Sequence, residues 1–420
     1  MSRGVRLLCC LAAMACAVGC GQRDPDYAAV VRQCAALPTA RASSLAPLRG
    51  QIEQIEADGG LPLQMAQRAA MGRPFPTLML HDQQRLSLGQ ELDAYTPGDR
   101  FTFDFETLSE VQKWLKNHKL LLDRVDTATG RLEGGPTPRF EQGFFDQMAS
   151  LDDAAIAARA LLLRGAVRLA NNDAAGAASD VAASLAWSDA LAKTARIETR
   201  ALAGLLRAEA LLAAEEVTWS AACTTAEIDQ LYAALRESLD GETGLREPLL
   251  GERAVVLHAY EAVQAGLLDK LVTDEEKKSL NKRGLMANWR SASSADIEAD
   301  ELAYLEAIGW VIEQSRRPLS EWRKPLVDRL ELLPAGTLAK ELFFRDLPDA
   351  MQLAYDDRAR REAAAVGLAT AGGLQLPPYR ENPANGVAYE ARRQQDRVRI
   401  LCGAARLHDP EFRIIERPTP

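Results

Sequence analysis

The segment that most restricts the fold of this chain is ALLLRGAVRLANNDAAGAASDVAASLAWSDAL, residues 160–191. Apolar residues recur at helical spacing on both sides of Asn172 and Asp173, two residue types that are typical of turns. Asp173 can cap the helix that follows, and Gly165 allows another helix to approach closely. The segment therefore predicts a hairpin of two helices joined by a tight turn.

The same segment resembles one unit of a tetratricopeptide array. Gly165, the Asn-Asp pair that starts seven residues later, and Ala177 follow that family's spacing. Two positions depart from it, because Leu161 stands where the family has a large aromatic residue and Asp189 stands where the unit ends in proline. The resemblance implies a helical-repeat body. A generic helical hairpin explains the segment equally well.

The rest of the chain up to Gly372 also favours helices. Hydrophobic residues make up 47% of the sequence and aromatic residues 6%, with many alanines and leucines, which are strong helix formers. We expect a mainly α fold of stacked helical hairpins, either α-solenoid-like or an irregular helical array. The alternation in residues 101–105 is a weak strand signal or the lead-in to a helix. Helices are expected in residues 44–71, 107–125, 140–170, 190–217, 225–239, 246–271, 273–289, 293–316, 320–333 and 347–370.

The pattern changes after Gly372-Gly373. Residues 387–390, 397–402 and 412–415 are short and alternating or branched, and an Asn385-Gly386 turn precedes them. These features predict a small antiparallel β tail at the C-terminus. The tail resembles the ending of a group of uncharacterised helical envelope lipoproteins whose pseudopilin-like β segment carries proline, glycine and tyrosine in that order, here Pro383, Gly386 and Tyr389. The resemblance implies no activity.

The N-terminus has the composition of a secretory leader. Arg3 and Arg6 precede the apolar run LLCCLAAMACAV at residues 7–18, which is shorter than the ~20 residues needed to span a bilayer. Small residues follow it, ending at Gly19 and Cys20. A plain signal peptide with a chance cysteine and a buried N-terminal helix are the alternatives.

Val18-Gly19-Cys20 resembles the lipobox of bacterial lipoproteins. The resemblance implies cleavage between Gly19 and Cys20 and acylation of the Cys20 thiol, which would hold a soluble domain at a membrane. Gly21 in place of aspartate favours the outer membrane. We therefore expect a signal peptide at residues 1–19, a tether with a short helix at 20–43, a helical domain at 44–372 and the β-rich tail at 373–420, in the cell envelope.

The cysteines argue against a disulfide framework. Three of the seven leave with the leader, and Cys20 is the expected lipidation site. Cys34, Cys223 and Cys402 can form at most one disulfide, and we interpret them as isolated thiols. The helical core must therefore hold the fold together without crosslinks.

The sequence offers few candidates for chemistry. A net charge of −9 without a basic stripe argues against nucleic acid as a partner. The four histidines lack metal-ligand spacing, and no phosphate loop or nucleophile elbow occurs, so we expect no metal and no cofactor. His258 and the six tryptophans are interpreted as packing residues. The acid pairs are interpreted as solvated faces or caps; they are Asp152-Asp153, Glu215-Glu216, Glu275-Glu276 and Asp356-Asp357.

These observations favour a non-enzymatic binding or scaffolding protein that is attached to a membrane through its N-terminal lipid and binds a protein or an envelope polymer. Two alternatives remain open. A hydrolase or lyase with paired carboxylates on a helical barrel would need convergent acids in one deep pocket. An accessory to a secretion apparatus would depend on the β tail.

Overall fold

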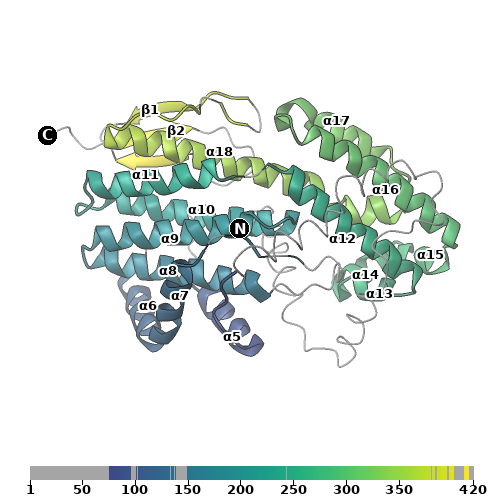
Figure 1. The fold of residues 1–420 in the computed structure, drawn as a ribbon, viewed down its shortest axis with the longest axis horizontal. Helices are drawn as coiled ribbons and strands as arrows, with labels where there is room; N and C mark the ends of the chain where they lie inside the picture. The colour runs from purple at the N-terminus through teal and green to yellow at the C-terminus, as the bar shows by residue number, and fades with distance from the viewer. Residues whose placement is uncertain are drawn as a thin grey trace.

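The structure of this chain is a computed structural model that describes residues 75–95, 101, 103–132, 134–136, 138, 149–242, 244–379, 381–383, 386–394, 397–401 and 411–415. Within these ranges the chain is mainly helical, as expected, and Figure 1 shows the arrangement. The helices are α5 (Asp82–Asp93), α6 (Phe105–Asn117), α7 (Lys119–Thr129), α8 (Ala149–Ala170), α9 (Ala174–Ala192), α10 (Ile197–Trp219), α11 (Thr225–Asp240), α12 (Arg246–Gln264), α13 (Leu268–Leu271), α14 (Asp274–Lys282), α15 (Leu285–Ser291), α16 (Ser294–Gln314), α17 (Leu319–Glu331) and α18 (Leu347–Gly372), with a π-helical turn, η3 (Ala339–Phe343).

The helical hairpin expected at residues 160–191 is confirmed as α8 and α9. Asn172 adopts the left-handed conformation that the tight turn requires, with φ of 62°. The Asp173 carboxylate caps α9 by accepting the Gly176 N–H at 2.8 Å. A Cβ on Gly165 would lie 3.4 Å from the Cβ of Asp180, so the glycine keeps α8 and α9 close.

Helices α8, α9, α10 and α11 form a stack on the left of Figure 1, with α18 beside it. Helix α9 lies against α8, α10 and α11, and α18 covers α10 and α11. The apolar core between them is rich in small residues, including Ala177, Ala178, Ala210 and Ala364. Small side chains let the helix axes approach closely, which explains why this alanine-rich sequence packs as a stack of straight helices.

A second group of helices, α12 to α17, lies on the right of Figure 1. Its larger core includes Trp289, Trp322 and the aromatic residues around Tyr304. The Asp300 carboxylate accepts the Tyr260 hydroxyl at 3.0 Å and the Leu338 and Ala339 N–H groups at 2.5 and 3.0 Å. These bonds fix the start of η3 against α16.

Several helices are shorter than the sequence suggests. The helix expected at 107–125 divides at His118, and those expected at 246–271 and 273–289 end at Gly266 and Gly284, whose φ angles are 78° and 72°. A left-handed glycine stops a helix without the steric cost that a side chain would bring. Residues 103–105 are the lead-in to α6, which Asp104 caps by accepting the Thr107 N–H at 2.8 Å. No strand forms there among the described residues.

Helix α18 joins the two groups. Its first turns, with Leu347 and Met351, belong to the core of α12–α17, whereas Ala364 and Leu368 belong to the core of the stack. One 26-residue helix therefore closes both cores. Removing α18 would therefore expose apolar surface in both groups.

Three short segments pair as antiparallel strands beside α18: β1 (Glu390–Gln394), β2 (Arg397–Leu401) and β3 (Glu411–Ile415), in the order β1-β2-β3. Arg399 is opposite Arg392 on β1 and Arg413 on β3. Ile400 is buried against Ala363 of α18. The complete tail at 373–420 stays a prediction, because residues 402–410 and 416–420 lie outside the described residues. The same holds for the leader, the tether and the helix expected at 44–71.

Two helical glycines provide a matched test of the packing. A Cβ on Gly251 of α12 would overlap the carbonyl oxygen of Ala195, whereas a Cβ on Gly309 of α16 would meet nothing within 4 Å. We expect Gly251→Ala to lower the free energy of unfolding by about 1–3 kcal/mol because the backbone must move. Gly309→Ala should raise it by up to about 1 kcal/mol through helix propensity. Denaturant titration of both variants measures the difference, and equal stabilities would contradict the close contact between α12 and Ala195.

Candidate functional site

The residues expected to be processed and lipidated, Gly19 and Cys20, lie outside the described residues. Their roles stay predictions. The described part of the chain contains two features that can be examined for chemistry. One is a buried cluster of charges between α9, α10, α11 and α18, and the other is a small pocket between α5, α8 and α10.

We call the buried cluster the central ion-pair network; its members are Asp189, Arg207, Ser238, Glu242, Asp357 and Arg361. Arg207 donates to Asp189 Oδ1 at 2.8 Å and to Asp357 Oδ2 at 2.8 Å. Arg361 donates to Asp357 Oδ2 at 3.0 Å and to Glu242 Oε1 at 2.9 Å. The two arginines therefore share one carboxylate, and each holds a second acid of its own.

Ser238 closes the network from α11. Its hydroxyl donates to Asp189 Oδ1 at 2.7 Å and accepts from Arg361 Nη1 at 3.1 Å. Gly204 lets α18 approach α10 at this point, because a Cβ there would lie 3.3 Å from the Cβ of Asp357. The network thus connects four helices across the middle of the stack.

The pKa values in the network follow from the charges around each group. Burial would raise the pKa of Asp357, but Arg361 and Arg207 outweigh it and hold the pKa below its ordinary value. Arg200, on α10, donates to Glu242 of the network at 3.3 Å; burial lowers the pKa of Arg200 to about 10, with Glu242 opposing the shift. The acids of the network are bonded to arginines, which suits a structural clamp better than a general acid or base.

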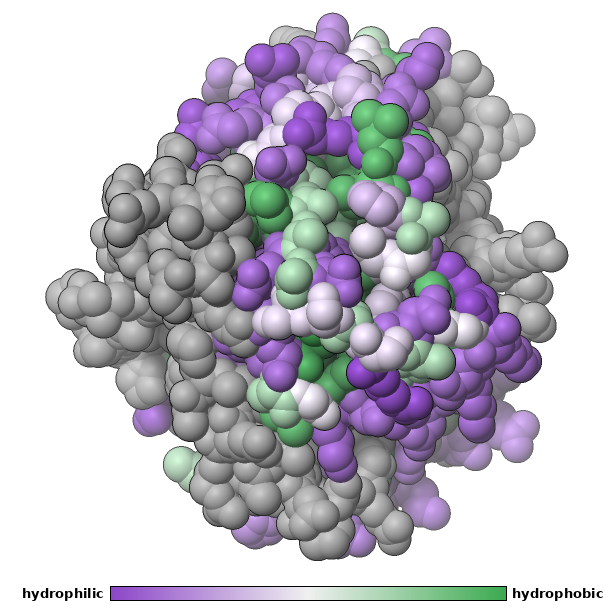
Figure 2. Space-filling view, turned by 90° about the vertical axis from the view of Figure 1, so that its right-hand side faces the viewer, coloured by the Kyte–Doolittle hydropathy of each residue, from purple (hydrophilic) through white to green (hydrophobic). Residues whose placement is uncertain are grey.

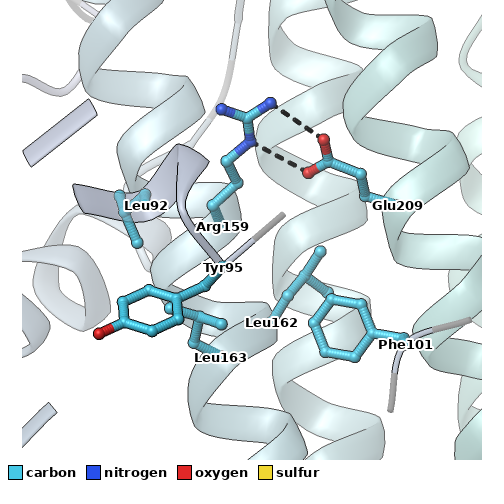
Figure 3. Close-up of a pocket in the computed structure, with 7 residues that line it drawn as sticks. All are labelled: Leu92, Tyr95, Phe101, Arg159, Leu162, Leu163 and Glu209. Atoms are coloured by element: carbon cyan, nitrogen blue, oxygen red, sulfur yellow. Dashed lines mark hydrogen bonds and ion pairs between the residues drawn. The ribbon is translucent and has the colours of Figure 1, made fainter. Parts of the chain in front are cut away.

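The second feature is the pocket in Figure 3. It is lined by Leu92, Tyr95, Phe101, Arg159, Leu162, Leu163 and Glu209, and has an empty volume of about 200 Å³ that includes its open mouth. Figure 3 shows the aromatic and leucine side chains below the Arg159–Glu209 pair. The enclosed space suffices for about one water molecule.

The guanidinium at this pocket is already neutralised. Arg159 makes a two-bond pair with Glu209, at 3.1 and 3.0 Å, and a third bond to Asp93 Oδ1 at 2.5 Å. Burial would lower the pKa of Arg159, but Glu209 and Asp93 raise it above its ordinary value. With two carboxylates on one cation, the pocket is a poor anion site.

One carboxylate stands out from these paired acids. Burial raises the pKa of Asp152, in the first turn of α8, to about 6, although Arg85 lowers it. Its neighbour Asp153 is fully buried and accepts from Arg85 Nε at 2.7 Å and from the Leu78 N–H at 2.9 Å. The pocket in Figure 3 does not include Asp152, so its raised pKa is not joined to a binding cavity there.

No family model, curated protein or solved structure matches this chain. Within the described ranges, no group of three or more His, Cys, Asp or Glu side chains is arranged to hold a metal ion. No helix in the same ranges is both long enough and apolar enough to cross a membrane. The candidate sites therefore rest on their own geometry.

The structure confirms some of the residue interpretations. His258 is buried in α12, and four of the six tryptophans are buried: Trp114, Trp187, Trp289 and Trp322. Cys223 is buried and is not part of a disulfide in the described part of the chain, as expected, while Cys34 and Cys402 lie outside the described residues.

The interpretation of the acid pairs as solvated faces or caps is wrong for three of the four pairs. Asp153, Glu215, Asp356 and Asp357 are buried. Arginines on other helices supply the counter-charges of Asp153 and Asp357. Only Glu275-Glu276 behaves as expected, with Glu276 completing the capping box of α14.

Sequence reasoning also missed the arginines. Arg159 and Glu209 are 50 residues apart, and Arg207 and Asp357 are 150 residues apart, so no local spacing connects them. A weak signal exists at Arg361, which lies two residues before the apolar stretch AAAVGLA on an alanine-rich helix. A charge in such surroundings needs a buried partner.

The shared carboxylate of the network can be tested directly. Asp357→Asn leaves Arg207 and Arg361 with too little negative charge in a buried site, so we expect it to lower the free energy of unfolding by about 3 kcal/mol at pH 7. Exposed Asp229→Asn on α11 is the control and should change the free energy of unfolding by less than about 0.5 kcal/mol.

Because the fold lowers the pKa of Asp357, the stabilisation that this carboxylate provides is present above the unfolded-state pKa of about 4 and disappears as the pH falls below that value. Equal stabilities at pH 7 would contradict the network.

Asp152 should respond in the opposite direction. Its folded-state pKa of about 6 exceeds the unfolded value, so the ionised form destabilises the fold above pH 6 and the effect vanishes below about pH 4. We expect Asp152→Asn to raise the free energy of unfolding by about 1 kcal/mol at pH 7.5, since solvent and the N-terminus of α8 moderate the cost. The gain should be smaller at pH 4.5. A gain that does not depend on pH would show that burial of the charge is not its cause.

Proposed function

We propose that this chain is a lipid-anchored cell-envelope protein whose helical body is a non-enzymatic binding or scaffolding module. The observation that carries the anchor is the sequence Val18-Gly19-Cys20 at the end of a short apolar run. In this proposal the leader is removed before Cys20, the thiol is acylated, and the body is held at a membrane. The outer membrane is favoured because Gly21 follows the cysteine.

The helical body supports the scaffolding part of the proposal. We infer that the α8–α9 hairpin belongs to an α-solenoid-like array and that residues 373–420 form a β tail on α18. A stack of hairpins buries one flank of each helix on its neighbour and leaves an extended flank for a partner. The partner is a protein or an envelope polymer.

An exposed surface on the second helical group also supports binding. Figure 2 views the molecule from the end where α13 to α17 lie, and hydrophobic atoms gather in a hollow near its middle, with hydrophilic atoms around it. Val327 of α17 is 44% exposed, and Leu332, which follows the last residue of α17, is 83% exposed. The guanidinium of Arg329 lies 5.5 Å from the centre of the Trp310 ring. Exposed apolar groups beside aromatic and cationic ones are common in binding surfaces.

The alternatives receive less support from the described residues. A helical-barrel hydrolase or lyase needs two free carboxylates in one deep pocket. The carboxylate that lines the described pocket, Glu209, has both oxygens bonded to Arg159. The secretion accessory depends on the tail, of which only short segments are described.

The anchor is tested by mass spectrometry of the N-terminal peptide from the protein expressed in a bacterial envelope. We expect a peptide that begins at residue 20 with an acylated thiol, and incorporation of labelled palmitate that Cys20→Ser abolishes. Cys34→Ser removes a nearby cysteine without touching the lipobox, so it should leave the label unchanged. A native protein with residues 1–19 intact and an unmodified Cys20 would overturn the proposal.

A further inference from the structure

The described chain begins with an extended segment, residues 75–81, that is held tightly to the body. Leu78 is fully buried, and its N–H donates to Asp153 Oδ2 at 2.9 Å. The carbonyl oxygens of Leu78 and Met79 accept from Arg124 Nη1 of α7 at 3.2 and 3.5 Å. Phe75 packs edge-on against Trp187, with ring centres 5.6 Å apart. This segment therefore has a fixed position beside α7.

Met79 turns away from the body at this point. Its φ of 51° lies in the left-handed region, which is uncommon for a residue other than glycine, and its side chain is 80% exposed. Leu120 lies one turn before Arg124 on α7 and is 76% exposed. Two large apolar side chains thus project into solvent from the two elements that Arg124 connects.

Positively charged residues are frequent in the sequence around Leu120. The whole chain is acidic, but residues 113–124 have a local excess of positive charge, because they contain four cations and a single carboxylate, Asp123. All four cations are exposed: Lys113, Lys116, Lys119 and Arg124. The next acid along α7, Asp126, is bonded to Arg164 at 2.7 Å. We call Met79, Leu120, Lys116, Lys119 and Arg124 the α7 patch.

We propose that the α7 patch rests on anionic lipid headgroups of the membrane that carries the lipid anchor. This inference rests on the proposed function, because it takes Cys20 as the anchor. Ammonium and guanidinium groups attract headgroup phosphates, and Leu120 and Met79 enter the boundary between headgroups and acyl chains. The positive patch complements a negative surface on a chain whose net charge is −9.

The position of the patch in the chain strengthens this assignment. The segment at residues 75–81 is the described part of the body closest in sequence to Cys20. An anchor at Cys20 would keep this end of the body near the bilayer, so even a weak contact would be occupied at the high effective concentration. Docking would then set which face of the helical body points away from the membrane.

The test uses the processed chain, residues 20–420, carrying Cys20→Ser so that no acyl group contributes. Vesicles of phosphatidylcholine with 30% phosphatidylglycerol are compared with vesicles of phosphatidylcholine alone by flotation. We expect binding to the anionic vesicles that weakens as salt rises. Lys116→Glu with Lys119→Glu should reduce that binding about 10-fold or more, and Leu120→Ser should reduce it several-fold.

Matched controls separate the patch from a general charge effect. Lys278→Glu with Lys282→Glu makes the same change in net charge at exposed positions of α14, and Leu376→Ser removes an exposed leucine that follows α18. Both should bind as the parent chain does. Absence of binding to anionic vesicles, or equal losses in the patch and control variants, would overturn this inference. Neither result bears on the acylation of Cys20, which mass spectrometry tests separately.

Discussion

The ionised side chain of Asp357 between Arg207 and Arg361 is the interaction on which the rest of the described structure depends. Burying a carboxylate costs several kcal/mol unless cations and hydrogen bonds replace the water around it. Here the cations come from α10 and α18. Arg361 in turn donates to Ser238, which lies on α11, and to Glu242, which follows the end of α11. The register of four helices is therefore fixed by charge, since a shift of one turn would leave a buried ion unpaired.

Apolar packing alone would specify this arrangement less well. The core of the stack consists largely of alanine and leucine, whose side chains make no directional bonds and therefore permit several helix registers. The buried arginines restrict the register, because each planar guanidinium can donate to its carboxylate partners in only a few geometries. Close approaches at Gly165, Gly204 and Gly251 add a second constraint, because a side chain there would push neighbouring backbone or side chains apart.

Much of the helical content follows from local sequence, and the arrangement of charges does not. Asn172 and Asp173 predict the α8–α9 turn because a turn and a cap depend on neighbouring residues. Thr273 and Glu276 identify the start of α14 for the same reason. By contrast, Asp357 is indistinguishable in sequence from an exposed acid on a helix, since its partner Arg207 is 150 residues away. The pocket residues Arg159 and Glu209 are equally remote from one another, so the candidate sites had to come from the three-dimensional structure.

The place of α18 near the end of the chain has a consequence for biogenesis. During synthesis or export the N-terminal helices emerge first, and until α18 follows them Arg207 lacks Asp357 while the apolar surfaces that Leu347, Met351 and Leu368 later cover face solvent. Such an incomplete intermediate is prone to aggregate. A chaperone that shields the earlier helices until the last part of the polypeptide has followed them would determine how much of this protein reaches the folded state.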